Sequence, residues 1–65
     1  MNIFINGNEY QPEQADSLAE LLAERQPKTP YAVALNGNFV SRGAYANTPL
    51  KDGDCIEILT PVQGG

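Results

Sequence analysis

Hydrophobic and polar residues alternate at the start of the chain. Ile3 and Ile5 fall on one side of the pattern and Phe4 on the other. A period of two is typical of a β-strand with one buried face. Asn6-Gly7 follows, a pair preferred in type I′ hairpin turns because both central residues of that turn need positive φ. The pattern therefore predicts a hairpin whose return strand covers 9–11.

A capping box, Ser17-Leu18-Ala19-Glu20, begins the next predicted element. In such a box the serine hydroxyl accepts a hydrogen bond from the main-chain amide of the residue three positions later. The carboxylate of that residue accepts one from the serine amide in return. The following apolar positions have helical spacing: Leu18, Leu21 and Leu22. They predict a helix of about two turns that ends near Arg25, before Pro27. A helix this short is not stable alone in water, so its leucines must pack on a sheet.

A second hairpin is predicted after the helix. Residues 31–35 alternate as the first strand does, Asn36-Gly37 repeats the turn signal, and Phe39 begins the return strand. Residues 41–49 have no clear period, and we expect them to be irregular, with Tyr45 anchoring them to the core.

The final strand is predicted at 55–60, after a solvated turn at Asp52-Gly53-Asp54. Ile56 and Ile58 lie on one side of this strand; the residues on the other side are Cys55, Glu57 and Leu59. Pro61 lacks the amide that a sheet ladder would use, so we expect the chain to leave the sheet there.

Two hairpins with a helix between them, followed by one more strand, predict an α+β fold. The helix crosses between the hairpins, so the first and last strands can lie side by side and parallel at the sheet centre. That arrangement is a β-grasp, a mixed sheet of about five strands with one helix packed across one face. We expect residues 1–60 to form this domain and residues 61–65 to form a flexible C-terminal tail.

Size and charge exclude several classes of function. Sixty-five residues leave little room for both a core and a deep substrate cleft, which argues against a self-sufficient enzyme. A net charge of −4 disfavours nucleic acid as a partner and favours a basic groove on another protein. The first ten residues do not resemble a signal peptide, and no apolar run is long enough for a bilayer. We therefore expect a cytoplasmic protein with no membrane partner, monomeric when free.

Catalytic chemistry has few candidate residues. The chain has one cysteine, Cys55, and no histidine, which excludes internal disulfides, Cys-His catalysis and His-metal sites. Asp52 and Asp54 have the spacing of a turn rather than a calcium loop. Arg42 and Lys51 are interpreted as surface ion-pairing residues, with partner binding as the alternative. We expect no catalytic residue, no metal and no bound cofactor.

The sheet face opposite the helix is a candidate docking surface. Phe4, Leu59 and Val62 are predicted on or near it, and Ala32 and Ala34 would leave it shallow and open. A cluster of exposed apolar residues marks a docking surface. From the sequence alone, docking and structural accident remain open.

The chain ends in Gly64-Gly65, and glycine can enter a channel too narrow for any other residue. The terminal carboxyl carbon is also unhindered. A carboxylate is unreactive until ATP converts it to an acyl-adenylate, from which a sulfur or amine nucleophile can displace AMP. Such chemistry requires a second protein that holds the nucleotide.

Residues 33–65 resemble the sulfur carrier proteins of thiamine biosynthesis, the ThiS family. The matching positions are Asn36-Gly37, Val40, Arg42, Tyr45, Leu50, Asp52-Gly53-Asp54, Ile56-Glu57-Ile58 and Pro61-Val62-Gln63-Gly64-Gly65. The first half fits in length and order. Ser41 stands where a proline is expected, and Tyr45 where tryptophan is common.

The resemblance implies a ubiquitin-like β-grasp whose Gly65 is adenylated by an E1-like adenylyltransferase and then converted to a thiocarboxylate. ATP is used by that partner, and a sulfur-donor protein supplies the sulfur. Gly65 would then deliver the sulfur to thiazole synthase. The tail that enters the partner's active site would be Val62, Gln63, Gly64 and Gly65.

Other functions compete with this one. The small sulfur-carrier subunit of molybdopterin synthase shares the fold and the Gly-Gly end, but that subunit is usually longer. A ubiquitin-like conjugation module would use the same tail to form an amide with a lysine. A plain structural domain with an inert tail is a further alternative.

Overall fold

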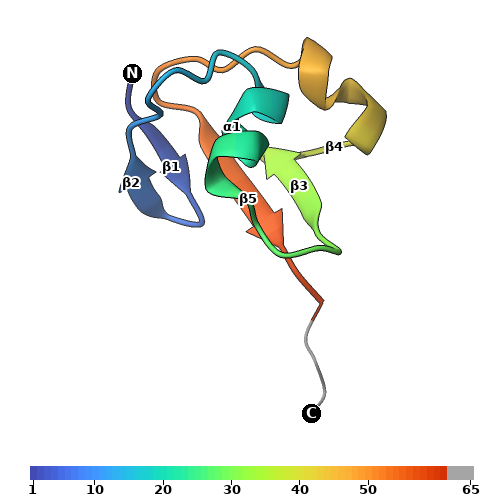
Figure 1. Cartoon of the computed structure of the whole chain (residues 1–65). Coiled ribbons are helices and arrows are strands. Elements are labelled where there is room, and N and C mark those ends of the chain that lie inside the picture. The colour runs from blue at the N-terminus through green and yellow to red at the C-terminus, as the bar shows by residue number, and fades with distance from the viewer. Residues whose placement is uncertain (62–65) are drawn as a thin grey trace.

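The structure is a computed structural model, and it describes residues 1–61. In chain order the elements are β1 (Ile3–Ile5), β2 (Asn8–Tyr10), α1 (Leu18–Arg25), β3 (Ala32–Leu35), β4 (Asn38–Val40), the 3₁₀ helix η1 (Arg42–Asn47) and β5 (Cys55–Leu59). The five strands form one sheet in the order β2-β1-β5-β3-β4 (Figure 1). β1 and β5 are parallel, and the other neighbours are antiparallel. The predicted α+β fold, with its mixed sheet and parallel central pair, is confirmed.

Both Asn-Gly pairs form the predicted turns. The φ angles are 51° and 84° at Asn6 and Gly7, and 51° and 86° at Asn36 and Gly37. These are the positive values that a type I′ turn requires. A two-residue turn lets the return strand begin at once, so β2 covers Asn8–Tyr10 rather than the predicted 9–11.

The helix has the predicted bounds and cap. The Ser17 hydroxyl accepts from the Glu20 amide at 3.2 Å, and the Glu20 carboxylate accepts from the Ser17 amide at 3.2 Å. At the other end Gln26 adopts a left-handed conformation and its amide donates to the Leu22 carbonyl. Such a residue closes the final turn and prevents the helix from continuing.

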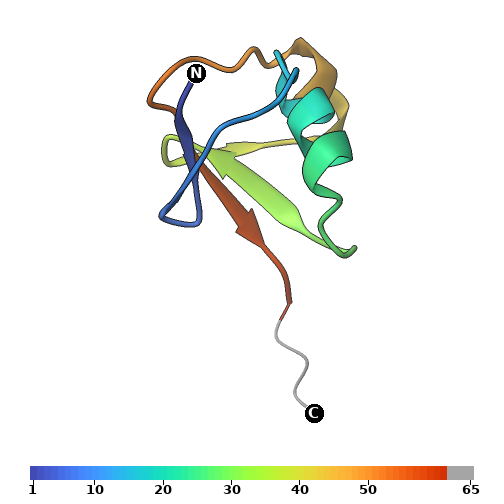
Figure 2. The ribbon, with the colours of Figure 1, turned by 60° about the vertical axis from the view of Figure 1, so that its left-hand side comes forward.

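The core lies between α1 and one face of the sheet, as Figure 2 shows from the side. Its buried residues are Ile3, Ile5, Ala15, Leu18, Leu21, Leu22, Val33, Leu50 and Ile56. All three helix leucines are among them, which confirms that the helix stripe packs on the sheet. Burying one such side chain contributes about 1.5–3 kcal/mol.

The segment 41–49 is more regular than predicted, because it contains η1. Short 3₁₀ helices carry no long apolar stripe, so the sequence offered no periodic signal. The predicted anchor is confirmed: Tyr45 is half-buried and packs against the core.

The turn before β5 was predicted to be solvated, and for Asp54 that prediction was wrong. Asp54 is only 9% exposed. Its carboxylate accepts from the Lys51 amide at 2.8 Å and from the Asn36 side chain at 3.0 Å. Asp52 accepts from the Asn2 amide at 2.8 Å. Both carboxylates therefore hold the two hairpins to the start of β5.

Asn6 also extends the central ladder beyond the end of β1. Its main-chain amide donates to the Ile56 carbonyl at 2.9 Å. Its side chain then accepts from the Ile58 amide at 2.8 Å and donates to the Ile58 carbonyl at 3.2 Å. The Asn6 carboxamide thus makes the two hydrogen bonds that a main-chain peptide group would make if β1 were longer. The pairing along β5 therefore continues from Ile56 to Ile58.

This arrangement predicts the effect of Asn6→Gly, which keeps the positive φ but removes the carboxamide. The Ile58 amide loses its acceptor, so its hydrogen exchange is expected to accelerate, and the protein to lose about 1–3 kcal/mol of stability. Hydrogen exchange followed by NMR measures the exchange rate at Ile58 and the loss of stability. The Phe4 amide, which donates to the main-chain carbonyl of Asp54, is the internal control. Unchanged protection at Ile58 would contradict the assignment.

The first hairpin is tied to the helix through Tyr10 and Glu24. The Tyr10 hydroxyl donates to Glu24 at 2.6 Å, and the Glu13 amide donates to the same carboxylate at 3.2 Å. The Tyr10 hydrogen bond is the main reason that the pKa of Glu24 lies below its ordinary value of 4.5. The same bond raises the pKa of Tyr10 above 10.0. A lowered folded-state pKa means that Glu24 stabilises the fold above about pH 4.5 and loses this contribution as the pH falls through its folded pKa.

Tyr10→Phe is therefore expected to raise the pKa of Glu24 toward 4.5, because the strongest donor to the ionised carboxylate is lost. The stability difference between the two proteins should shrink as Glu24 becomes protonated. An NMR titration of the Glu24 carboxyl carbon measures the first effect and denaturation at several pH values the second. Equal Glu24 pKa values in both proteins would show that the hydrogen bond does not act as described.

Candidate functional site

The end of β5 fixes the point from which the last residues of the sequence depart. Leu59 pairs with Ala32 of β3, and the Asn6 side chain holds Ile58 from the other side. Thr60 and Pro61 follow outside any strand. Figure 1 shows this end of β5 pointing away from the N-terminus of the chain. The predicted site residues Val62, Gln63, Gly64 and Gly65 lie outside the described residues.

The register brings apolar side chains together on the sheet face opposite α1. Phe4 lies beside Cys55, and Ala32 lies beside Leu59. In the next row Ala34 pairs with Phe39. We call this the outer face; its residues are Phe4, Glu9, Ala32, Ala34, Phe39, Cys55, Glu57 and Leu59.

Three large side chains of the outer face are accessible to a partner: Phe4 is 38% exposed, Leu59 56% and Phe39 72%. A hollow of about 450 Å³ runs beside Phe4 and Cys55, with Gly7 and Gly37 at its edge. The structure thus places the predicted residues Phe4 and Leu59 on one open face.

Phe39 belongs to the same face and was not singled out by the sequence reasoning. A signal for it existed: a two-residue turn at Asn36-Gly37 fixes the hairpin register, which pairs Phe39 with Ala34. Because paired residues share a face, Phe39 could have been assigned to the face of the two alanines.

Cys55 and the acidic side chains were the other candidates for chemistry. Cys55 is exposed on the outer face, and its thiol lies 3.8 Å from the Gly53 carbonyl. Within the described part of the chain, no three Cys, Asp or Glu side chains converge into a metal-binding group. No helix within residues 1–61 has the length and apolar character that crossing a membrane requires.

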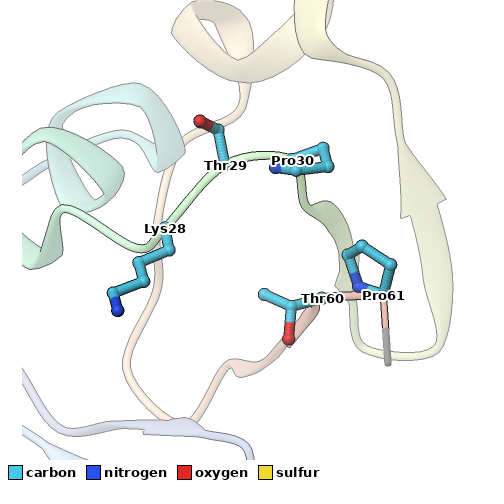
Figure 3. Close-up of a pocket in the computed structure, with 5 residues that line it drawn as sticks. All are labelled: Lys28, Thr29, Pro30, Thr60 and Pro61. Atoms are coloured by element: carbon cyan, nitrogen blue, oxygen red, sulfur yellow. The ribbon is translucent and has the colours of Figure 1, made fainter. Parts of the chain in front are cut away.

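A second hollow lies where the chain leaves the sheet. It has a volume of about 420 Å³ and is lined by Lys28, Thr29, Pro30, Thr60 and Pro61. In Figure 3 the loop that carries Lys28 and Pro30 lies opposite Thr60 and Pro61 across this space. All five residues are exposed, so the hollow is a surface depression beside the root of the C-terminal segment.

The arrangement defines a class of protein. A helix on one face, an open apolar opposite face and a central last strand that points its end outward form a ubiquitin-like β-grasp.

The family comparison agrees with this class. The model of the ThiS family matches residues 3–65, and the chain belongs to that family, the sulfur carriers of thiamine biosynthesis. Proteins of this family are carriers and not enzymes. No curated protein matches this chain.

Solved structures give the same result. The crystal structure of the thiamine biosynthesis protein ThiS from Geobacter metallireducens is 35% identical, with a TM-score of 0.83 and coverage of 100% of both chains. An NMR structure of a thiamine biosynthesis protein from the same organism is also 35% identical, with a TM-score of 0.77, covering 100% of this chain and 88% of that one. A chain from the complex of subunits 1 and 2 of molybdopterin-converting factor from Helicobacter pylori 26695 is 33% identical. Its TM-score is 0.61, with coverage of 98% and 96%.

Proposed function

We propose that the carboxyl group of Gly65 carries the sulfur. An E1-like adenylyltransferase activates it with ATP, which forms an acyl-adenylate and releases pyrophosphate. Sulfide delivered by a sulfur-donor protein then attacks the acyl carbon and displaces AMP, which leaves the thiocarboxylate. Thiazole synthase takes the sulfur from this group. The carrier itself binds no cofactor in this cycle, because the activating enzyme holds the nucleotide.

The observation that carries this proposal is the position of β5 in a ThiS-family chain. β5 is the central strand, bonded on both sides, and its last paired residue is Leu59. Six residues separate Leu59 from the end of the sequence, and the last two are glycines without a Cβ. A rigid strand followed by a slim segment can insert a carboxyl group into an active site that the folded domain cannot enter. In this proposal residues 1–60 dock and residues 61–65 are inserted.

The outer face would dock the partners. Phe4, Phe39 and Leu59 are exposed there and together offer an apolar contact, which is typical of the centre of a protein–protein interface. Leu59 and Val62 would continue this contact from the sheet into the tail. Docking beside the root of the tail lets the partner align the domain and the carboxyl group together.

Transfer to thiazole synthase is favoured over a role in molybdopterin synthase by the structural comparison. The likeness to the ThiS crystal structure extends over both complete chains with a TM-score of 0.83, against 0.61 for the molybdopterin-converting factor chain. The two functions share the chemistry at Gly65 and differ in the acceptor.

The proposal predicts a defined change of mass. After co-expression with the activating enzyme and a sulfur source, intact-mass spectrometry is expected to show one oxygen-to-sulfur exchange, located at Gly65 by fragmentation. Deletion of Gly65 should abolish the exchange and leave thermal stability unchanged, because β5 ends at Leu59 and the core lies within the domain. Cys55→Ser, which removes the thiol, should still show the exchange at Gly65, because the proposed sulfur site is the terminal carboxyl group. Sulfur found on Cys55, or no exchange on the full chain, would refute the proposal.

A further inference from the structure

Arg42 lines a pocket that belongs neither to the outer face nor to the C-terminal tail. The pocket has a volume of about 390 Å³ and is lined by Thr29, Tyr31, Arg42 and Tyr45. It therefore combines one guanidinium group with three residues that carry hydroxyl groups. Tyr31 and Tyr45 are half-buried and pack against the core, so the walls of the pocket are fixed by the fold.

The charges of the chain are segregated around this pocket. All eight acidic residues lie within 9–24 and 52–57. The stretch 26–51 has no Asp or Glu, but it contains Lys28, Arg42 and Lys51. None of the described residues that line the pocket is an Asp or Glu. An otherwise acidic protein thus presents a cation in a pocket whose other described lining residues carry hydroxyl groups.

The pocket adjoins the root of the tail. Thr29 lines both this pocket and the hollow formed with Thr60 and Pro61. In Figure 3 its side chain points away from Thr60 and Pro61. Four residues follow Pro61 in the sequence, and fully extended they span at most ~14 Å. An enzyme that holds Gly65 in its active site must therefore approach this end of the domain closely.

We propose that Arg42, with Thr29, Tyr31 and Tyr45, forms a recognition pocket for a carboxylate side chain on the enzyme that adenylates the tail. This inference rests on the proposed function above. The guanidinium group presents its donors in a planar fork that fits a carboxylate with two hydrogen bonds. The hydroxyl groups can donate further bonds to the same anion. The interaction orients the carrier on the enzyme and takes no part in the reaction at Gly65.

The test is a steady-state assay of pyrophosphate release by the activating enzyme with the carrier as the varied substrate. Arg42→Gln is expected to raise the KM for the carrier roughly 10- to 100-fold, the loss typical of a hydrogen-bonded charge at an interface. The value of kcat should stay unchanged, because binding and not chemistry is affected. Arg42→Lys should restore only part of the affinity, since lysine keeps the charge but lacks the fork.

Lys51→Gln is the matched control, because it removes the same charge from the same acid-free stretch outside the pocket. It should leave KM within about two-fold of the wild type, as expected for an isolated surface charge. Thermal denaturation and NMR spectra of each variant establish that the fold is retained. If Arg42→Gln and Lys51→Gln change KM equally, or if Arg42→Gln lowers kcat alone, the recognition pocket is refuted.

Two further outcomes are separable. If the wild-type carrier elicits no pyrophosphate release, the proposed function fails; wild-type activity with an unchanged KM in Arg42→Gln overturns the pocket alone. NMR titration of the Gly65 carboxyl carbon adds a further test: equal pKa values of this group in the wild type and in Arg42→Gln are expected. A higher pKa in the variant would show that Arg42 acts on the chain's own carboxyl group, and would overturn the proposal.

Discussion

The architecture depends on how the central strand is held. β5 is parallel to β1 on one side and antiparallel to β3 on the other, so it contacts both hairpins. Each hairpin adds an asparagine side chain to these main-chain bonds. Asn6 bonds to Ile58 near the end of β5, and Asn36 accepts from the Cys55 amide at its start, at 2.9 Å. The residues that form the two turns therefore also fix the strand that leads to the C-terminal segment.

At both positions asparagine serves two purposes: it forms the turn, and its side chain bonds to β5. Asparagine tolerates the positive φ of a type I′ turn, and its carboxamide carries both a donor and an acceptor, as a peptide group does. Glycine at Asn6 or Asn36 would make the same turn without holding β5. In the function proposed here, the central strand, the outer face and the Arg42 pocket act together: they orient the domain on a partner while the last residues reach the partner's active site.

Much of this fold could be predicted because its signals are local. The Asn-Gly pairs, the Ser17–Glu20 capping box and the alternation at Ile56 and Ile58 each act within a few residues, and all were placed correctly. The details that escaped prediction depend on distant partners. Asn6 meets Ile58 only after the crossover places β1 beside β5, and the burial of Asp54 depends on the approach of Asn36. The sequence was enough to predict that Phe4 and Leu59 lie on the same face of the sheet. That these residues dock a partner remains a prediction.

The central claim is that the carrier delivers sulfur for thiamine through its last residue. Genetic complementation of a strain that lacks its own carrier tests this most directly. The full chain is expected to restore growth without thiamine, and the chain without Gly65 is expected to fail although it folds. Equal rescue by both chains, or rescue of a molybdenum-cofactor defect but not of the thiamine requirement, would contradict the account.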